Sequence, residues 1–182
     1  MYIDRQKSAA EWLTYFSKEF ESESNRAAAI ISTALLEHHL EILLKNTLVT
    51  SPDKEDKLFD GPIAPLSGFY SKIEMSYRLG LIPLQFRKDL HLIREIRNKF
   101  GHNITRCDFK DKEIRLLIKK LGVLESMIME DDERAIKVTA NPRIGYQYSV
   151  AWLLFCIVLQ SLRIKRIPKE VDSFMMKLLA IE

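Results

Sequence analysis

The chain has 182 residues, 47% of them hydrophobic and 29% charged, a composition that suits one globular domain and excludes an intrinsically disordered chain. With only 6 glycines and 6 prolines, it does not fit an all-β protein rich in tight turns. Its formal net charge of +3 is compatible with a polyanionic partner but does not require one.

The cysteines and the first residues bear on cofactors and compartment. Cys107 and Cys156 lie far apart, and Cys and His show no metal-ligand spacing, so we expect no metal site and no cofactor. The first twelve residues lack the apolar core of a signal peptide. We therefore expect a cytoplasmic protein.

Apolar residues at helical spacing predict two helices in the first quarter of the chain. One covers about residues 5–20. Ser24 is a suitable N-cap for a second helix, which runs to about residue 48. We expect His38 to lie on the core-facing side of this helix, beside Ala28, Ile31, Leu35 and Ile42. His38 and His39 point about 100° apart on a helix, so they cannot bind one metal ion together.

A long connection and a helical hairpin follow. Residues 50–67 contain three prolines and Gly61, and they predict an extended connection with one helical turn near residues 54–59. A helix over about residues 68–79 can end at Gly80. Pro83 suits the first turn of the next helix, which Gly101 can end.

The last part of the chain predicts further helices. Asp108 or Asp111 can start one over about residues 112–129, and a short one covers about residues 169–181. Asn141 and Pro142 can start a helix to about residue 164. Its apolar run, residues 150–159, is shorter than the about 20 residues of a membrane span, so we expect a buried helix and no membrane. The chain is predicted to be all-α, a single-domain bundle of about six to eight helices over residues 1–182.

The segment LIREIRNKFGH, residues 92–102, carries the most function-suggestive groups. Arg97 follows Ile93 by four residues and Leu90 by seven, so the periodicity predicts that it faces the core. A guanidinium there needs a carboxylate partner or a wet cleft. The candidate partners by helical position are Glu37, Glu41 and Glu74.

Two interpretations of this segment stay open. Arg97, Asn98 and His102 could together bind a phosphate and move a proton, which makes them candidate catalytic residues. Alternatively, Arg97 pairs with a buried glutamate and His102 satisfies the last carbonyl groups of its helix.

Residues 72–89 partly mimic a DNA-binding helix-turn-helix, with Gly80 at the turn. The second helix, however, continues to Phe100 with an apolar stripe along its length, whereas a recognition helix must keep one face free for the groove. A helical hairpin within a bundle explains the same residues better.

Four blocks of the sequence carry a resemblance to a known family. They are ESNRAAAI (residues 23–30), LFDGPIAPL (58–66), LGLI (79–82) and LIREIRNKFGH (92–102). Together they resemble the mannitol operon repressor (MltR) family of bacterial proteins. The resemblance implies an all-α fold and transcription regulation without an evident helix-turn-helix. The candidate binding residues are Glu23 and Arg26 in the first block and Arg94 and Arg97 in the last.

The last block is also similar to the R-x4-H motif of HEPN helical bundles, matched here by Arg97, Asn98 and His102. Active members of that superfamily are metal-independent ribonucleases and are often dimers. Two functions therefore stay open. One is a regulatory or interaction protein that binds a protein partner or nucleic acid. The other is an endoribonuclease, with His102 as general acid or base and Arg97 stabilising the phosphorane.

Overall fold

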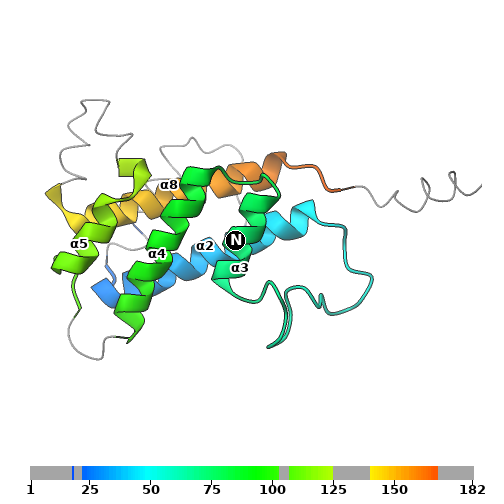
Figure 1. Cartoon of the computed structure of the whole chain (residues 1–182), viewed down its shortest axis with the longest axis horizontal. Coiled ribbons are helices and arrows are strands. Elements are labelled where there is room, and N and C mark those ends of the chain that lie inside the picture. Colours follow the sequence, from blue (N-terminus) through cyan, green and yellow to red (C-terminus); the bar gives the residue numbers. More distant parts are fainter. Residues whose placement is uncertain (1–17, 19–21, 103–106, 125–139, 168–182) are drawn as a thin grey trace, which may run out of the picture.

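The computed structural model describes residues 18, 22–102, 107–124 and 140–167. Apart from residue 18, the helices predicted over residues 5–20 and 169–181 fall outside this part of the chain. The helices are α2 (Asn25–Thr47), α3 (Phe69–Arg78), α4 (Leu84–His102), α5 (Lys112–Lys119) and α8 (Pro142–Arg163). The described residues contain no strand, and the all-α prediction is confirmed (Figure 1).

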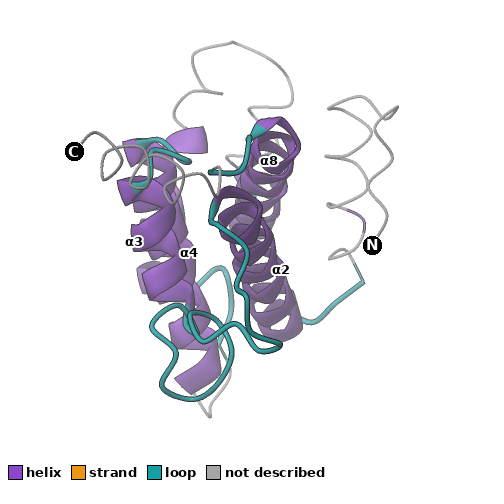
Figure 2. Ribbon diagram, turned by 90° about the vertical axis from the view of Figure 1, so that its right-hand side faces the viewer, coloured by secondary structure: helices purple, strands orange, loops and turns teal. Residues whose placement is uncertain are grey.

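The helices pack in two layers around a common core. Figure 2 shows α2 and α8 side by side in one layer, with α3 and α4 together in the other. The short turn between α3 and α4 makes them the predicted helical hairpin. The rings of Phe100, Phe109 and Tyr146 connect α4 to α8, with centroids 4.8 and 4.9 Å apart, and all three side chains are buried.

Local signals set the helix ends as predicted. The Ser24 hydroxyl accepts a hydrogen bond from the Ala27 amide at 3.1 Å and caps α2. The Asn141 side chain caps α8 by accepting from the Arg143 amide, with Pro142 as the first helical residue. Gly80 has φ +68°, which allows the chain to leave α3.

Two predicted helix ends are wrong. α4 does not end at Gly101 but continues to His102. α5 ends at Lys119, not near residue 129. Just beyond it, the buried Asp89 carboxylate on α4 accepts a hydrogen bond from the Gly122 amide at 2.9 Å, which fixes the chain where it leaves α5.

The predicted core face of α2 is also wrong. His38 is exposed and His39 is buried, and Ile31 is 38% exposed. The helix packs against α3, α4 and α8, so residues on several sides are covered and periodicity alone gives no unique face. Burial, followed by the nearby His38, lowers the pKa of His39 to about 4.

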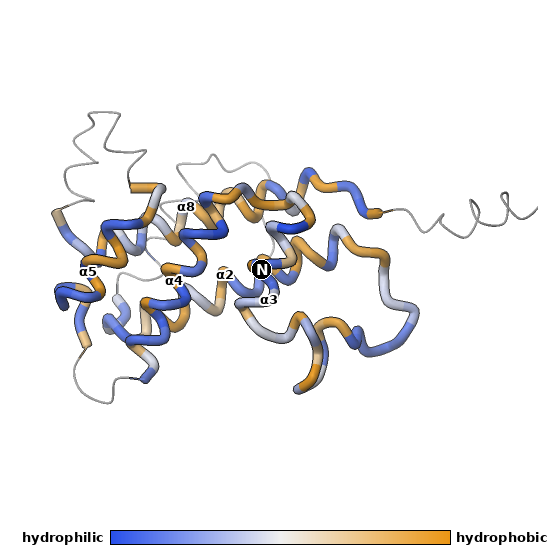
Figure 3. Tube along the Cα trace, viewed as in Figure 1, coloured by the Kyte–Doolittle hydropathy of each residue, from blue (hydrophilic) through white to orange (hydrophobic). Residues whose placement is uncertain are grey.

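Within the described residues, α2 and α8 are long and apolar enough, by length and composition, to cross a membrane. About half of each apolar window is buried inside the bundle, and the Ser32 and Tyr146 hydroxyls hydrogen-bond between the two helices at 2.8 Å. Burial of this extent is typical of helices in the core of a bundle. α4 is instead amphipathic, and hydrophobic and hydrophilic residues alternate along it in Figure 3.

Candidate functional site

The hairpin carries a row of interlocked polar and aromatic side chains across its outer face. Spacings of three and four residues place the members of each row on one face of their helix. We name this set the α3–α4 ladder, and it consists of Tyr70, Glu74 and Tyr77 on α3 and Arg87, His91 and Arg94 on α4.

Glu74 is the charged centre of the ladder. Its carboxylate accepts two hydrogen bonds from Arg87, from Nε at 2.8 Å and from Nη2 at 3.1 Å, and it lies 2.7 Å from His91 Nε2. The hydrogen bond from Arg87 holds the pKa of Glu74 below its ordinary value. This bidentate pair fixes the two helices in register and neutralises the charge of Arg87.

Two tyrosine rings contact the arginine and histidine side chains of the ladder. The Arg94 guanidinium lies 5.3 Å from the centre of the Tyr70 ring, and the His91 ring lies 5.2 Å from it. Arg87 lies 5.4 Å from the centre of the Tyr77 ring. Stacking on a ring orders a guanidinium while its N–H edge stays free for a partner. Tyr70 is 53% exposed, so this end of the ladder faces solvent.

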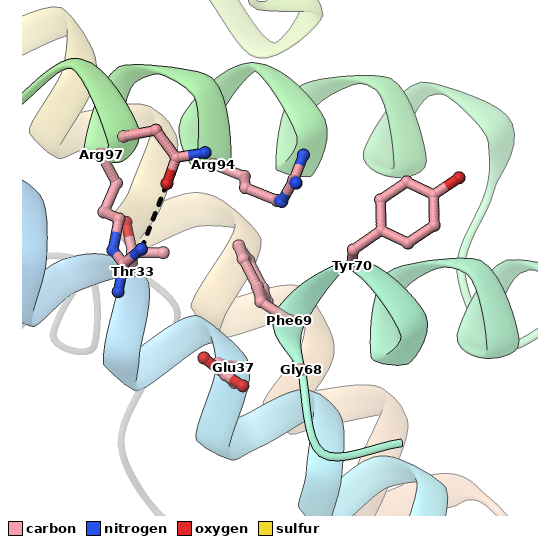
Figure 4. A pocket seen from close by; sticks show the side chains of 8 residues that line it. Thr33, Glu37, Gly68, Phe69, Tyr70, Arg94 and Arg97 are labelled. Atoms are coloured by element: carbon pink, nitrogen blue, oxygen red, sulfur yellow. Dashed lines mark hydrogen bonds between the residues drawn. The ribbon is translucent and has the colours of Figure 1, made fainter. Parts of the chain in front are cut away.

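A pocket of about 360 Å³ adjoins this end of the ladder, between α2, α4 and the start of α3 (Figure 4). Arg97 Nη1 donates a hydrogen bond to Asn98 Oδ1 at 3.1 Å, the dashed line in the figure. The pocket is lined by Thr33, Glu37, Gly68, Phe69, Tyr70, Arg94, Arg97 and Asn98.

The prediction that Arg97 faces the core is wrong, because its side chain is exposed in this pocket. Leu90, seven residues earlier on nearly the same side of α4, is fully buried. The difference comes from α3, which begins at Phe69 and reaches only as far as Arg94. α4 continues about 12 Å beyond that point. Arg97 therefore lies where the covering helix is absent.

The glutamates predicted as partners of Arg97 bind other cations. Glu37 and Glu41 both bind Lys72, at 3.1 and 2.9 Å from its Nζ, and Glu74 binds Arg87. Lys72 was missed in the sequence, although it shares its row with the buried Phe69, Ile73 and Ser76. The same helical periodicity that was applied to Arg97 could have found it.

A part-buried line of four alternating charges begins at Glu37 in the wall of the pocket. The Lys72 side chain is only 5% exposed between Glu37 and Glu41, and Lys45 lies 2.7 Å from Glu41 on its other side. Burial raises the pKa of Glu41, but the hydrogen bonds from Lys45 and Lys72 lower it more, so the net shift is downward. The four charges sum to zero.

The other predicted site residues lie elsewhere. His102 is the exposed last residue of α4 and does not line the pocket, since it follows Arg97 by about 140° around the helix. The Glu23 carbonyl and the Asn25 side chain accept hydrogen bonds from Arg143, which ties the start of α2 to α8. Arg26 is exposed and lies about two turns before Thr33, outside the pocket.

No group of His, Cys, Asp or Glu side chains in the described part of the chain could hold a metal ion. Of the three residues that the ribonuclease interpretation requires, the pocket brings together Arg97 and Asn98 only.

The comparisons with known proteins add one fold neighbour. No family model matches the chain, and neither does any curated protein. Among solved structures, it is similar to a chain in the X-ray structure of the MtlR–HPr complex from Escherichia coli, at 19% identity and a TM-score of 0.60. The match covers 81% of this chain and 98% of that one. This structural match gives no support to the resemblance to HEPN bundles. The chain therefore has a fold like that seen in the MtlR–HPr complex.

Proposed function

We propose that the chain is a regulatory protein that acts by binding a protein partner of the HPr kind through the α3–α4 ladder. The observation that carries the proposal is the make-up of this surface. Tyrosine and arginine are enriched where protein interfaces concentrate their binding energy, and Tyr70, Arg87 and Arg94 lie together here. Their mutual contacts hold them in place, which reduces the entropy lost on binding.

The charge of this surface favours an acidic partner. The Arg87 charge is balanced by Glu74, whereas Arg94 and Arg97 add two positive charges at the pocket end. Complementary charge at an interface speeds association and selects the partner.

The fold neighbour supports this choice of partner class. Its structure is that of MtlR, a mannitol operon regulator, in complex with HPr. Together with the four sequence blocks, it supports a role in transcription regulation, which we propose takes place in the cytoplasm. We propose that the chain exerts this role through its partner and not by reading DNA. α4 packs against both α2 and α3, and the α3–α4 pair is a helical hairpin within the bundle, which supports this choice over DNA reading.

Isothermal titration of the chain with Escherichia coli HPr tests the proposal, with Escherichia coli MtlR as the positive control. We expect saturable binding that Tyr70→Ala and Arg94→Gln each weaken by about tenfold or more. The matched control is Lys88→Gln, which removes a positive charge from an exposed position of α4 outside the ladder. No binding where MtlR binds, or an equal loss with Lys88→Gln, would contradict the proposal.

A further inference from the structure

Among the described residues, the two arginines of the pocket have no carboxylate partner. In the described part of the chain, no carboxylate lies within 4.0 Å of a nitrogen of Arg94 or Arg97. Arg94 is three residues before Arg97, so the two side chains leave neighbouring positions on one face of α4, and both line the pocket. Like charges at this spacing repel, and an anion between them would relieve the repulsion.

The carboxylate nearest in the fold does not supply that anion. Glu37 lines the same pocket, but its Oε1 accepts a hydrogen bond from Lys72 Nζ at 3.1 Å. The four-charge line through Lys72 is neutral as a whole, so Glu37 does not cancel the arginines. The positive charges of Arg94 and Arg97 therefore remain on the side of the pocket that α4 forms.

Both guanidinium groups are held in place before any ligand arrives. Tyr70 stacks on Arg94 at 5.3 Å, and the Asn98 side chain accepts a hydrogen bond from Arg97 at 3.1 Å. A preset guanidinium fork matches the oxygens of phosphate or carboxylate with two parallel hydrogen bonds.

The opposite wall offers hydrogen-bond acceptors. Glu37 Oε2 receives no hydrogen bond from the described residues, and its side chain is 31% exposed. Figure 4 shows Glu37 on α2, one turn beyond Thr33 and across the pocket from Arg94. A hydroxyl or ammonium group could donate to this carboxylate. The volume, about 360 Å³, is at the small end of ligand sites.

We infer that this pocket binds a small molecule that carries a phosphate or carboxylate group at one end and a hydroxyl or ammonium group at the other. The anionic end lies between Arg94 and Arg97, and the donor end faces Glu37. The inference does not depend on HPr binding, because it concerns the pocket and not the remainder of the ladder.

Titration of the full chain with two probes tests it, at constant ionic strength in chloride. Inorganic phosphate represents the anionic end alone, and phosphoethanolamine adds the ammonium group. The readouts are isothermal titration and the side-chain Nε–H signals of arginine in NMR spectra. We expect both probes to bind saturably and to shift two arginine signals. Arg94→Gln and Arg97→Gln each remove one of these signals, and each weakens binding by about tenfold or more.

Two further variants test whether binding depends on the pocket and not on net charge alone. Lys88→Gln, with the same change in net charge, should alter either affinity by less than about twofold. Glu37→Gln should weaken phosphoethanolamine binding and leave or improve phosphate binding, since it removes a negative charge. No saturable binding, or an equal loss with Lys88→Gln, overturns the inference. So does a Glu37→Gln variant that binds phosphoethanolamine as the unaltered chain does. If Arg97→Gln impairs HPr binding and neither probe binds, the arginines serve the protein interface and the inference is wrong.

Discussion

Replacing Lys72 by methionine tests the ion pairs that this buried lysine forms beside the pocket. Methionine keeps most of the length of the side chain but removes the ammonium group. In the native chain this group lies 3.1 Å from Glu37 and 2.9 Å from Glu41, and the lysine side chain is 5% exposed. The variant therefore leaves two carboxylates, four residues apart on α2, without their shared cation.

The structure sets the expected loss of stability. Removing one partner of a fully buried ion pair costs about 3–5 kcal/mol. Here the Glu37 and Glu41 side chains are 31% and 27% exposed, so water screens part of the penalty. We expect Lys72→Met to lower the free energy of unfolding by about 2–3 kcal/mol at neutral pH.

Urea denaturation at several pH values measures this loss. The pKa of Glu41 is lowered in the native chain, so its pairing contributes stability above the ordinary carboxyl pKa. That contribution disappears as the pH falls through the lowered pKa. The deficit of Lys72→Met should therefore be largest at neutral pH and shrink below about pH 4.5.

A matched control separates burial from charge. Lys57→Met removes an exposed lysine, 86% accessible, that lies 3.5 Å from Asp53. We expect its stability to change by less than about 0.5 kcal/mol. The reasoning fails if Lys72→Met is no more destabilising than Lys57→Met, or if its deficit is the same at every pH.

Three further predictions concern His39, the cap of α2 and the ribonuclease alternative. His39 has a pKa of about 4 in the fold, so between the ordinary histidine pKa and that value the unfolded chain binds more protons. The free energy of unfolding, measured by urea denaturation, should fall by about 2 kcal/mol from pH 7 to pH 5 because of His39. If the free energy of unfolding of His39→Gln falls by the same amount over this pH range, the prediction is wrong. Ser24→Ala should cost about 1 kcal/mol in the same assay, and an unaltered midpoint would show that the cap contributes nothing. The unaltered chain should leave RNA intact in EDTA; cleavage that both Arg97→Ala and His102→Ala abolish would establish the ribonuclease.

The features predicted correctly are those that depend on a few neighbouring residues. Ser24 and Asn141 satisfy amide groups two or three positions away, and Gly80 supplies a backbone angle that other residues rarely adopt. These interactions form within one turn of the chain. They need no knowledge of the other helices, and so the sequence suffices.

The features predicted wrongly depend on which helices lie nearby. α2 is apolar on several sides, and only its neighbours α3, α4 and α8 decide that His39 and not His38 is buried. Lys72 lies in the core because Glu37 and Glu41, some thirty residues earlier in the chain, balance its charge. No local pattern contains that pairing.

Arg97 shows how a helix boundary creates a candidate site. Along one side of α4, Leu90 is fully buried while Arg97 opens into a pocket, although both occupy nearly the same angular position. The change occurs because α3 has 10 residues and α4 has 19, and because α3 starts at Phe69 after the extended Gly68. If α3 began one or two turns earlier, it would cover Arg97, and the arginine would require a buried carboxylate. The pocket is therefore a consequence of unequal helix lengths in the hairpin, because α3 begins too late to cover Arg97.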